Sequence, residues 1–199
     1  MTKQVDSEVT AILLAAGESR RMGEFKQLLP FKGKSFVECC VDTLLASHVS
    51  RIIVVTGHRE ADVRAALEAR PVTTAYNTDY KSGMASSIKR GVEALPPDAR
   101  AILIALVDQP QIAIETVNHI IETYETHRPL IVVPTCRGRD GHPVLLDSSL
   151  KQEVLDMDPG QGLRQVVRSH LDRTIRTEVG NEDVLVDFDF PDEYRSRKD

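Results

Sequence analysis

Short runs of apolar residues rich in valine and isoleucine recur along the chain, and segments with helical periodicity separate them. Such runs are typical of buried strands, whereas apolar positions spaced three and four apart are typical of amphipathic helices. Strands that alternate with helices form βαβ units, so the pattern predicts an α/β domain with a mostly parallel sheet. The predicted strands are Val9–Ala15, Ile52–Thr56, Val72–Tyr76, Ile102–Val107 and Leu130–Pro134.

Two of the intervening helices have clear apolar stripes, which we expect to cover the sheet. The first helix follows Ser35, which together with Glu38 fits a capping box. The second helix precedes the strand at Leu130–Pro134. The stripes are Val37, Val41, Leu44 and Leu45 in the first helix, and Ile114, Val117, Ile120, Ile121 and Tyr124 in the second.

Composition narrows the class of protein. With 199 residues, 41% of them hydrophobic, and no internal repeat, the chain fits one domain, residues 1–199. A net charge of −5 argues against a nucleic-acid backbone or an anionic membrane as the main partner. The start of the chain lacks the apolar segment of a signal peptide, and the apolar runs are too short to span a bilayer. We therefore expect a soluble protein.

The cysteines agree with a cytoplasmic location. They are three in number, and no pair has the C-x-x-C spacing of a metal site. Cys39 and Cys40 lie within the helix predicted after Ser35, where packing explains them better than nucleophilic chemistry. With Cys136 as the third, this usage is typical of a reducing compartment.

The first candidate site is the turn that follows the first strand. Small residues Ala15, Ala16 and Gly17 allow a ligand to approach the backbone, whose N–H groups can bind phosphate oxygens or a base edge. Arg21 offers a planar fork of donors and Lys26 a compact charge, both suited to phosphate. The alternative is an ordinary strand-to-helix turn with solvated basic residues.

Acidic residues mark a possible metal site. Asp108 follows a buried strand, at the edge where α/β sheets present functional groups, and its carboxylate can hold Mg²⁺ against a triphosphate. The alternative for Asp108 is a structural role, in which it caps a helix or orders a turn before Pro110. Asp187 and Asp189 alternate along an extended segment, so both point to the same side and Phe188 points toward the core.

One residue of this second pair can complete the metal site, but a structural role is a rival. Pro191 is a typical first residue of a helix, and acids near a helix start are common capping and dipole-stabilising groups. The segment Gly83–Ser87 also opens a predicted helix, whose free N–H groups are natural partners for polar ligand atoms, although N-capping explains the serines equally well.

Residues Leu14–Pro30 read LAAGESRRMGEFKQLLP, and they match every fixed position of the pattern LAAGxSxRMGxxKxLLP. This segment resembles the signature loop of the molybdenum cofactor nucleotidyltransferases, within the superfamily of nucleoside-triphosphate transferases. It differs from the Walker and dinucleotide fingerprints, which disfavours a P-loop ATPase or an NAD enzyme. Further segments resemble the family in the same order: Asn77 with Gly83–Ile88, Leu106–Pro110, Gly138–Pro143 and Asp187–Asp192.

The resemblance implies a three-layer, Rossmann-like domain of the nucleotide-diphospho-sugar transferase type. Its nucleotide-binding half spans about residues 9–110 and its acceptor-binding half about 111–199. It implies catalytic roles for Arg21, Lys26 and Asp108, with Asp108 and Asp189 holding Mg²⁺ or Mn²⁺. The implied contacts are Leu14, Ala15, Ala16, Gly17, Arg21, Lys26, Asn77, Gly83, Ser87 and Asp108 for the nucleotide, and Gly141, His142, Pro143 and Arg164 for the acceptor.

The implied reaction transfers CMP from CTP to a molybdopterin-type cofactor and releases pyrophosphate. Ala16, in LAAG rather than LAGG, is similar to the cytidylyl-transferring branch. A molybdenum hydroxylase is then a possible partner. The alternatives are transfer to a sugar phosphate or polyol phosphate, and a noncatalytic carrier of a nucleotide-bearing cofactor.

The chain departs from the family on the acceptor side. A Gly-Asp-x-Gly-x-Arg-like segment is common there, but residues 159–164 read Pro-Gly-Gln-Gly-Leu-Arg. The retained Gly160, Gly162 and Arg164 can still form an anion-binding turn before a helix predicted at Leu163–Leu171. No orienting carboxylate is evident for His142, so we assign it no role as a general base.

Overall fold

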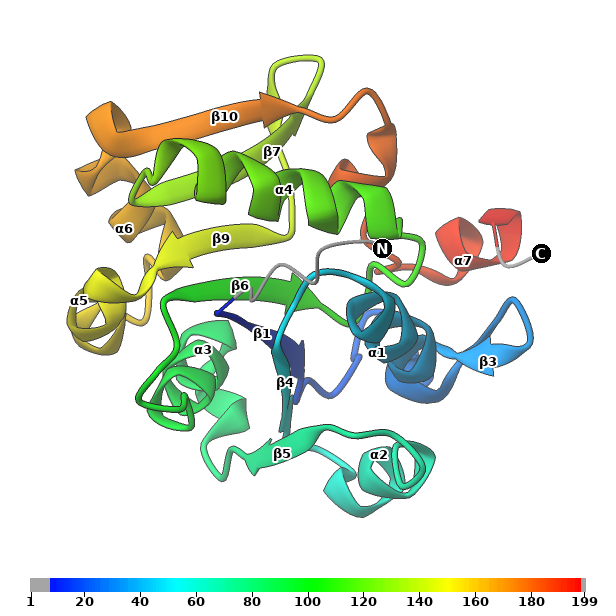
Figure 1. Ribbon diagram of the computed structural model, residues 1–199. Helices are drawn as coiled ribbons and strands as arrows, with labels where there is room; N and C mark the ends of the chain where they lie inside the picture. The colour runs from blue at the N-terminus through cyan, green and yellow to red at the C-terminus, as the bar shows by residue number, and fades with distance from the viewer. Residues whose placement is uncertain (1–7, 198–199) are drawn as a thin grey trace.

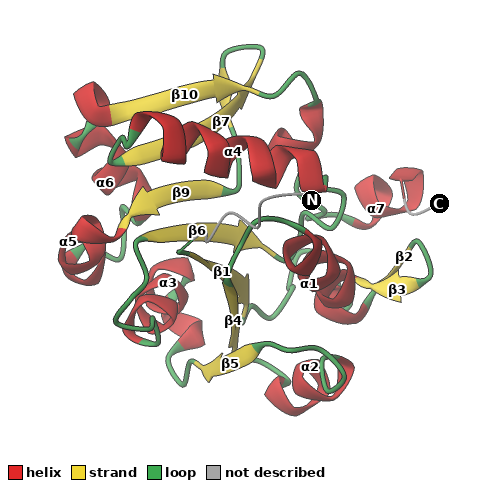
Figure 2. Ribbon diagram, in the orientation of Figure 1, coloured by secondary structure: helices red, strands yellow, loops and turns green. Residues whose placement is uncertain are grey.

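A computed structural model describes residues 8–197, and its centre is a twisted sheet with helices on both faces (Figures 1 and 2). The strand order is β10-β7-β9-β6-β1-β4-β5, and the short β8 pairs with β7. The predicted three-layer α/β fold is confirmed. The strands are β1 Val9–Ala15, β2 Pro30–Phe31, β3 Lys34–Ser35, β4 Arg51–Thr56, β5 Thr73–Tyr76, β6 Ala101–Leu106, β7 Ile131–Cys136, β8 Arg139–Asp140, β9 Val144–Asp147 and β10 Thr174–Glu178.

The helices cover the two faces of the sheet in separate groups. Helices α1, α2 and α4 contribute to the core on one face, and α3, α5 and α6 to the core on the other. The α-helices are α1 Phe36–Ala46, α2 Glu60–Ala66, α3 Met84–Glu93, α4 Ile114–His127, α5 Lys151–Asp156, α6 Leu163–Ser169 and α7 Pro191–Arg197. The 3₁₀ turns are η1 Lys26–Leu28, η2 Tyr80–Ser82, η3 Ser148–Leu150, η4 Leu171–Arg173 and η5 Glu182–Leu185.

Strand β1 lies between β4 and β6 and is parallel to both. Leu14 pairs with Val55 of β4 and with Leu106 of β6, so the three strands end at the same edge of the sheet. Strand β9 is antiparallel to its neighbours β6 and β7, while β10 is parallel to β7. The sheet is therefore mostly parallel, as predicted, and the carboxyl ends of β1 and β6 are adjacent.

The side chains of β1 alternate between the two cores, which explains why this strand reads as a continuous apolar run. Leu13 and Ala15 belong to the core beneath α1, α2 and α4. Ile12, Leu14 and Ala16 belong to the opposite core, beneath α3, α5 and α6. A strand covered on both faces has no position for a solvated polar side chain.

Helix α1 begins with the predicted capping box. The Ser35 backbone N–H and its hydroxyl both donate to Glu38 Oε2, at 2.8 and 2.6 Å. Val37, Val41 and Leu44 are buried, but Leu45 is 41% exposed, so its assignment to the buried stripe is wrong. At about 100° per residue, position 45 lies on the edge of the stripe rather than at its centre.

Most other boundaries differ from the predictions by one or two residues, within the usual fraying of element ends. Helix α6 ends at Ser169, before the predicted Leu171, because the chain there forms the turn η4. Helix α7 begins at Pro191 as predicted. Cys39, Cys40 and Cys136 form no disulfide. Among residues 8–197, no helix is long and apolar enough to cross a membrane.

Candidate functional site

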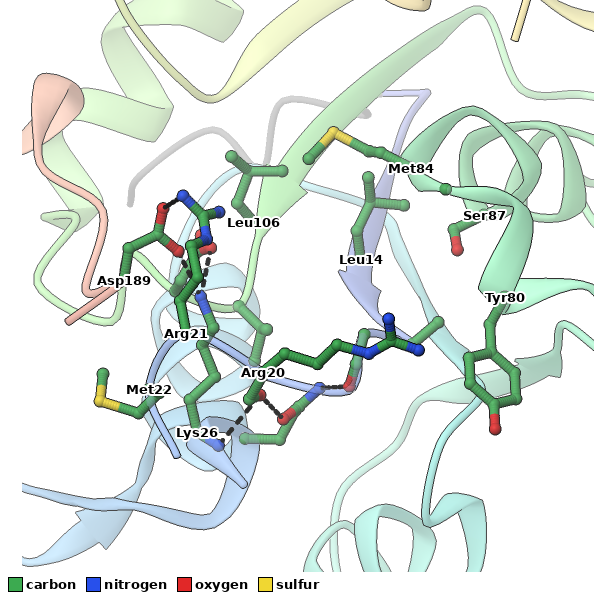
Figure 3. Close-up of a pocket in the computed structure, with 17 residues that line it drawn as sticks. Leu14, Arg20, Arg21, Met22, Lys26, Tyr80, Met84, Ser87, Leu106 and Asp189 are labelled. Carbon is green, nitrogen blue, oxygen red and sulfur yellow. Dashed lines mark hydrogen bonds and ion pairs between the residues drawn. The ribbon is translucent and has the colours of Figure 1, made fainter. Parts of the chain in front are cut away.

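A cavity of about 290 Å³ opens at the carboxyl ends of β1 and β6, where parallel α/β sheets bind ligands (Figure 3). The turn after β1, the start of α3 and the end of β6 form its walls. One residue, Asp189, enters from the C-terminal part of the chain. The lining residues are Leu14, Ala16, Gly17, Ser19, Arg20, Arg21, Met22, Lys26, Gln27, Tyr80, Gly83, Met84, Ser87, Leu106, Val107, Asp108 and Asp189.

Four charged groups meet in one wall of this cavity. The Lys26 ammonium lies 2.9 Å from Asp108 Oδ2 and 2.9 Å from Asp189 Oδ1. Arg21 Nη1 lies 2.8 Å from the other carboxylate oxygen of Asp189, Oδ2. The dashed lines in Figure 3 follow these contacts. The fold thus brings together the basic residues of the first turn and two of the predicted acids.

The electrostatic environment keeps Lys26 charged. Burial lowers the pKa of its ammonium, but the attraction of Asp108 and the hydrogen bonds to both carboxylates outweigh that effect, so the pKa is raised above its ordinary value. Arg21 is more exposed and also lies over the ring of Phe190. Lys26 is therefore a fixed cation inside the cavity, and Arg21 is a cation at its rim.

The carboxylates of this cluster fit a hard divalent cation. Asp108 Oδ1 is buried and accepts no hydrogen bond from any residue in the described range 8–197, while its Oδ2 contacts Lys26. Among these residues no group of three or more histidine, cysteine, aspartate or glutamate side chains is arranged to hold a metal. Two carboxylates alone are the set that Mg²⁺ and similar ions use when substrate phosphates complete the coordination.

Asp187 forms no ion pair with Lys26 and instead accepts a hydrogen bond from Gln109. Gln109 Nε2 donates to Asp187 Oδ1 at 2.9 Å and to the carbonyl of Val184 at 3.3 Å. Burial and the nearby charge of Asp108 raise the pKa of Asp187, while the Gln109 hydrogen bond lowers it. Phe188, between the two acids, is fully buried, as predicted. Asp189 rather than Asp187 thus joins Lys26.

The turn after β1 contains an internal hydrogen-bonding group that the sequence reasoning missed. Gln27 is 1% exposed, and its Nε2 donates to the carbonyl oxygens of Ala15, at 3.2 Å, and Gly17, at 2.8 Å. Its Oε1 accepts a hydrogen bond of 3.0 Å from the hydroxyl of Ser19. Position 27 is variable in the recognised motif, so only the three-dimensional contacts identify it.

Two residues predicted to contact the nucleotide do not line the cavity. The side chain of Ala15 is fully buried in the core on the opposite side of the sheet from Leu14. The Asn77 amide donates to the hydroxyls of Ser86 and Ser87, at 2.9 and 3.0 Å, and its oxygen accepts from Asp79 N. Asn77 therefore orders the start of α3, whereas Ser87, like Gly83, lies in the cavity wall.

Three further lining residues were not among the predicted nucleotide contacts, although Met84 belongs to the Gly83–Ile88 segment that resembles the family. Arg20, Tyr80 and Met84 face the cavity from the first turn and from the segment before and at the start of α3 (Figure 3). Tyr80 packs against His58, with ring centroids 6.1 Å apart. These side chains add an apolar and cationic surface on the side opposite Asp189.

The predicted acceptor residues lie outside this cavity. Gly141 packs so tightly against Val184 that a Cβ added at Gly141 would lie 2.4 Å from the carbonyl oxygen of Val184. The His142 backbone N–H donates to the same carbonyl at 3.0 Å. Burial lowers the pKa of the His142 imidazole, Asp108 opposes that shift and Arg164 reinforces it. His142 thus lies within electrostatic range of both Asp108 and Arg164.

The turn before α6 is only partly available to an anion. The Gly160 N–H donates to Asp158 Oδ1 at 2.7 Å, so one donor of the predicted anion-binding turn is already used. The N–H groups of Gln161 and Gly162 donate to the carbonyl of Asp158. Because its own acid occupies these donors, the turn itself is largely closed to an anion, and the exposed Arg164 adds a positive charge just after it.

Comparisons with known proteins agree with this geometry. The chain is 33% identical over 170 residues to nicotine blue oxidoreductase of Paenarthrobacter nicotinovorans, covering 80% of this chain and 81% of the relative. It is 27% identical over 195 residues to molybdenum cofactor cytidylyltransferase of Escherichia coli strain K12, covering 97% of each chain.

Solved structures share the whole fold. The crystal structure of Rv0371c from Mycobacterium tuberculosis H37Rv superposes with a TM-score of 0.86 at 27% identity, covering 98% of both chains. A structure of Rv0371c in complex with manganese superposes with a TM-score of 0.80 at 24% identity, covering 96% of this chain and 97% of that one. The MobA-like NTP transferase domain matches residues 11–174, and the chain therefore belongs to this nucleotidyltransferase family.

Proposed function

We propose that this protein transfers CMP from CTP to a molybdopterin-type acceptor and releases pyrophosphate. The observation that carries the proposal is the cavity at the ends of β1 and β6, in which Arg21 and Lys26 face Asp108 and Asp189. Such a site combines cations for a leaving pyrophosphate with carboxylates for a divalent ion. Nucleotidyl transfer needs both.

The two cations have different tasks in this reaction. Lys26 is held at the cavity wall by two carboxylates and largely shielded from solvent, so its charge is in place to stabilise the leaving pyrophosphate. Arg21 is at the exposed rim, and its guanidinium can bridge two phosphate oxygens as the triphosphate enters. Orientation and charge neutralisation dominate catalysis of phosphoryl transfers.

Asp108 and Asp189 would hold the divalent cation, Mg²⁺ or Mn²⁺. Asp108 Oδ1, which has no hydrogen-bond partner among residues 8–197, supports this assignment, and the manganese complex of the mycobacterial protein Rv0371c supports the choice of a divalent cation. The bound ion would neutralise charge on the triphosphate. Asp108 has a second function in the chain itself, because its backbone carbonyl accepts a hydrogen bond of 2.9 Å from Phe188 N and so anchors the segment that carries Asp189.

The acceptor would approach from the side of Gly141, His142, Pro143 and Arg164. Arg164 is exposed, and its positive charge can attract the acceptor's phosphate. A phosphate oxygen is already a nucleophile, so no strong base is required. This agrees with a neutral His142, whose pKa is lowered by burial and which would act as a hydrogen-bonding group.

The choice of CTP and of a molybdopterin-type acceptor rests on Ala16 in the LAAG loop and on the cytidylyltransferase of E. coli among the relatives. Another relative, nicotine blue oxidoreductase, is named for a different class of reaction. A shared fold leaves the substrate open. A sugar phosphate or polyol phosphate acceptor remains the alternative within the same chemistry.

Pyrophosphate release tests the proposal directly. The purified protein is incubated with Mg²⁺ or Mn²⁺, each nucleoside triphosphate in turn, and either molybdopterin cofactor or a panel of sugar and polyol phosphates. We expect release with CTP and the molybdopterin-type acceptor, and none without acceptor. Release only with a sugar or polyol phosphate would redirect the proposal to the alternative acceptor. Nucleotide binding without release under any condition would indicate a carrier.

A further inference from the structure

Gln27 connects the two ends of the nucleotide loop. The chain leaves β1 at Ala15, passes Ser19 and Arg21, and returns at the turn η1, where Gln27 is buried. The hydrogen bonds of Gln27 reach back to the carbonyls of Ala15 and Gly17 and to the hydroxyl of Ser19. All donors and acceptors of this amide are thus directed at one turn of the backbone.

Lys26 is part of the same network. The Lys26 backbone N–H donates to Ser19 Oγ at 3.2 Å, and the same hydroxyl donates to Gln27 Oε1. Ser19 adopts a left-handed backbone conformation, with φ 57°, which is unfavourable for a non-glycine residue. The contacts through its hydroxyl help to hold this conformation, and they couple the turn to the backbone of the catalytic lysine.

The orientation of the Gly17 carbonyl has a consequence for ligand binding. In a planar trans peptide the C=O and the following N–H point in opposite directions, so a Gly17 carbonyl that faces Gln27 turns the Glu18 N–H away from it. Within residues 8–197, the N–H groups of Gly17 and Glu18 donate no hydrogen bond, and Gly17 lines the cavity. They are available to phosphate oxygens.

We infer that Gln27 is a positioning residue for the nucleotide: its side-chain amide fixes the turn from Ala15 to Ser19 so that free backbone N–H groups and Lys26 face the triphosphate. This inference rests on the proposed nucleotidyl transfer and adds to it the residue that preorganises the phosphate site. Only a side chain that donates and accepts at the same time satisfies these contacts.

Two substitutions test this role. Gln27→Met keeps the approximate length and removes the polar groups, whereas Gln27→Glu keeps the shape and sets a carboxylate against the carbonyl oxygens of Ala15 and Gly17. The matched control is Gln152→Met on α5. Gln152 is exposed, and its side-chain amide donates a hydrogen bond to Asp156 in the same helix, far from the nucleotide loop in the sequence. Binding of CTP with Mg²⁺ is measured by calorimetry, and KM, kcat and Tm are measured in parallel.

We expect Kd and KM for CTP to rise about tenfold in Gln27→Met and further in Gln27→Glu, because unsatisfied buried groups distort the turn. Gln152→Met should match the wild type. A residue that served only global stability would lower Tm and the active fraction and leave Kd and KM within twofold. That outcome overturns the inference. Wild-type protein that binds no nucleoside triphosphate contradicts the proposed function instead.

If the Gln27 variants do not fold, the Ser19→Ala variant tests the same hydrogen-bond network. Ser19 is partly exposed, and the substitution removes only the hydroxyl between Gln27 Oε1 and Lys26 N. We expect a smaller rise in the Kd for CTP, in the same direction. An unchanged Kd in this variant would also overturn the inference.

Discussion

The ammonium of Lys26 lies 2.9 Å from Asp108 Oδ2, and the same ammonium lies 2.9 Å from Asp189. A divalent cation held by these two carboxylates could use Asp108 Oδ1, which has no hydrogen-bond partner among residues 8–197, but both oxygens of Asp189 already contact a basic side chain, Oδ1 that of Lys26 and Oδ2 that of Arg21. Lys26 and the cation therefore compete until phosphate oxygens of the nucleotide draw the lysine away. Metal binding and nucleotide binding should consequently be coupled.

Replacing Lys26 by methionine should change the two affinities in opposite directions. Without its competitor, the carboxylate pair should bind Mn²⁺ in the absence of nucleotide at least about tenfold more tightly, a difference of about 1.4 kcal/mol. Binding of CTP should weaken and transfer should slow, because the charge that stabilises the leaving group is gone. Electron paramagnetic resonance of free Mn²⁺ and calorimetry with CTP measure the two effects.

Lys34→Met is the control for this experiment. Lys34 also contacts an aspartate, Asp42, at 2.6 Å, but on the exposed surface of α1 and outside the cavity. Its replacement should alter neither affinity. If Lys26→Met bound Mn²⁺ no better than wild type, Lys26 would not compete with the metal ion for the carboxylates.

Asp108→Asn should leave the fold intact and reduce pyrophosphate release by about a hundredfold or more. The asparagine keeps the backbone carbonyl that accepts from Phe188 N, and it removes the negative charge from the ligand of the divalent ion. The Tm should lie within a few degrees of the wild-type value, and the circular dichroism spectrum should be unchanged. Full activity would exclude Asp108 from the site.

The contrast between Asp108 and Gln27 indicates how far sequence reasoning can go. Asp108 follows a buried apolar strand, and topology alone brings the carboxyl ends of neighbouring strands together, so its location was predictable. Gln27 is variable in the motif, and its role depends on three hydrogen bonds to a turn that folds back on it. No periodicity or spacing encodes such a contact.

Asn77 shows the same limit of sequence reasoning, because a residue predicted to contact the nucleotide is instead bonded to its neighbours. The residue occurs in a motif that resembles a nucleotide-contacting segment, yet its amide is used by the hydroxyls of Ser86 and Ser87 and by Asp79 N. A polar residue near a site can bind the ligand or shape the residues that do. Only the complete set of hydrogen bonds distinguishes these roles.

Gly141→Ala should disturb both stability and activity. Its Cβ would lie 2.4 Å from the carbonyl oxygen of Val184, so the segment that leads to Asp189 must shift. Overpacking of this kind costs about 1–3 kcal/mol. Gly180→Ala is the control: its Cβ meets no atom within 4 Å, and φ 67° adds only backbone strain. Urea unfolding should show the loss of stability in Gly141→Ala. Pyrophosphate release should fall in Gly141→Ala and stay at the wild-type level in Gly180→Ala.

Tyr124→Phe should reduce stability in a pH-dependent way. The Tyr124 hydroxyl donates to Asp147 Oδ2 at 2.6 Å, within the core between α4 and β9. Burial and this carboxylate raise the pKa of Tyr124 to about 12. Burial of Asp147 acts to raise the pKa of its carboxyl, but hydrogen bonds from Ser149 and Tyr124 outweigh it, so the pKa is lowered.

These shifts fix the sign of the effect. The Asp147 contribution to stability is present above its unfolded pKa of about 4, and it is lost as the pH falls through the lower folded value. The Tyr124 contribution is present below pH about 10 and is lost only as the pH rises through about 12. Urea unfolding should give wild type an advantage of about 1 kcal/mol from pH 5 to 9 that shrinks below pH 4. An advantage that grew on acidification would contradict this assignment.

The last prediction concerns the base, and it depends on the packing of Ala16. Ala16 lines the cavity and adopts an ordinary negative φ, so the loop does not require glycine here. The carbonyl oxygen of Ala16 accepts from His58 N at 3.0 Å, and its methyl group packs toward Gly57, where an added Cβ would lie 2.8 Å away. The methyl group is therefore fixed in the cavity wall.

Ala16→Gly should narrow a preference for CTP over GTP without abolishing activity, because the fixed methyl group crowds a purine more than a pyrimidine. One methyl group in a pocket contributes about 1–3 kcal/mol to discrimination, so the ratio of kcat/KM values should shift by about ten- to two-hundredfold at most. Both ratios are measured with one acceptor. Asn77 and Ser87 remain unchanged in the variant, so a shift can be attributed to the loop. A wild type that uses GTP at least as well as CTP would contradict both the base assignment and the cytidylyl-transferring branch.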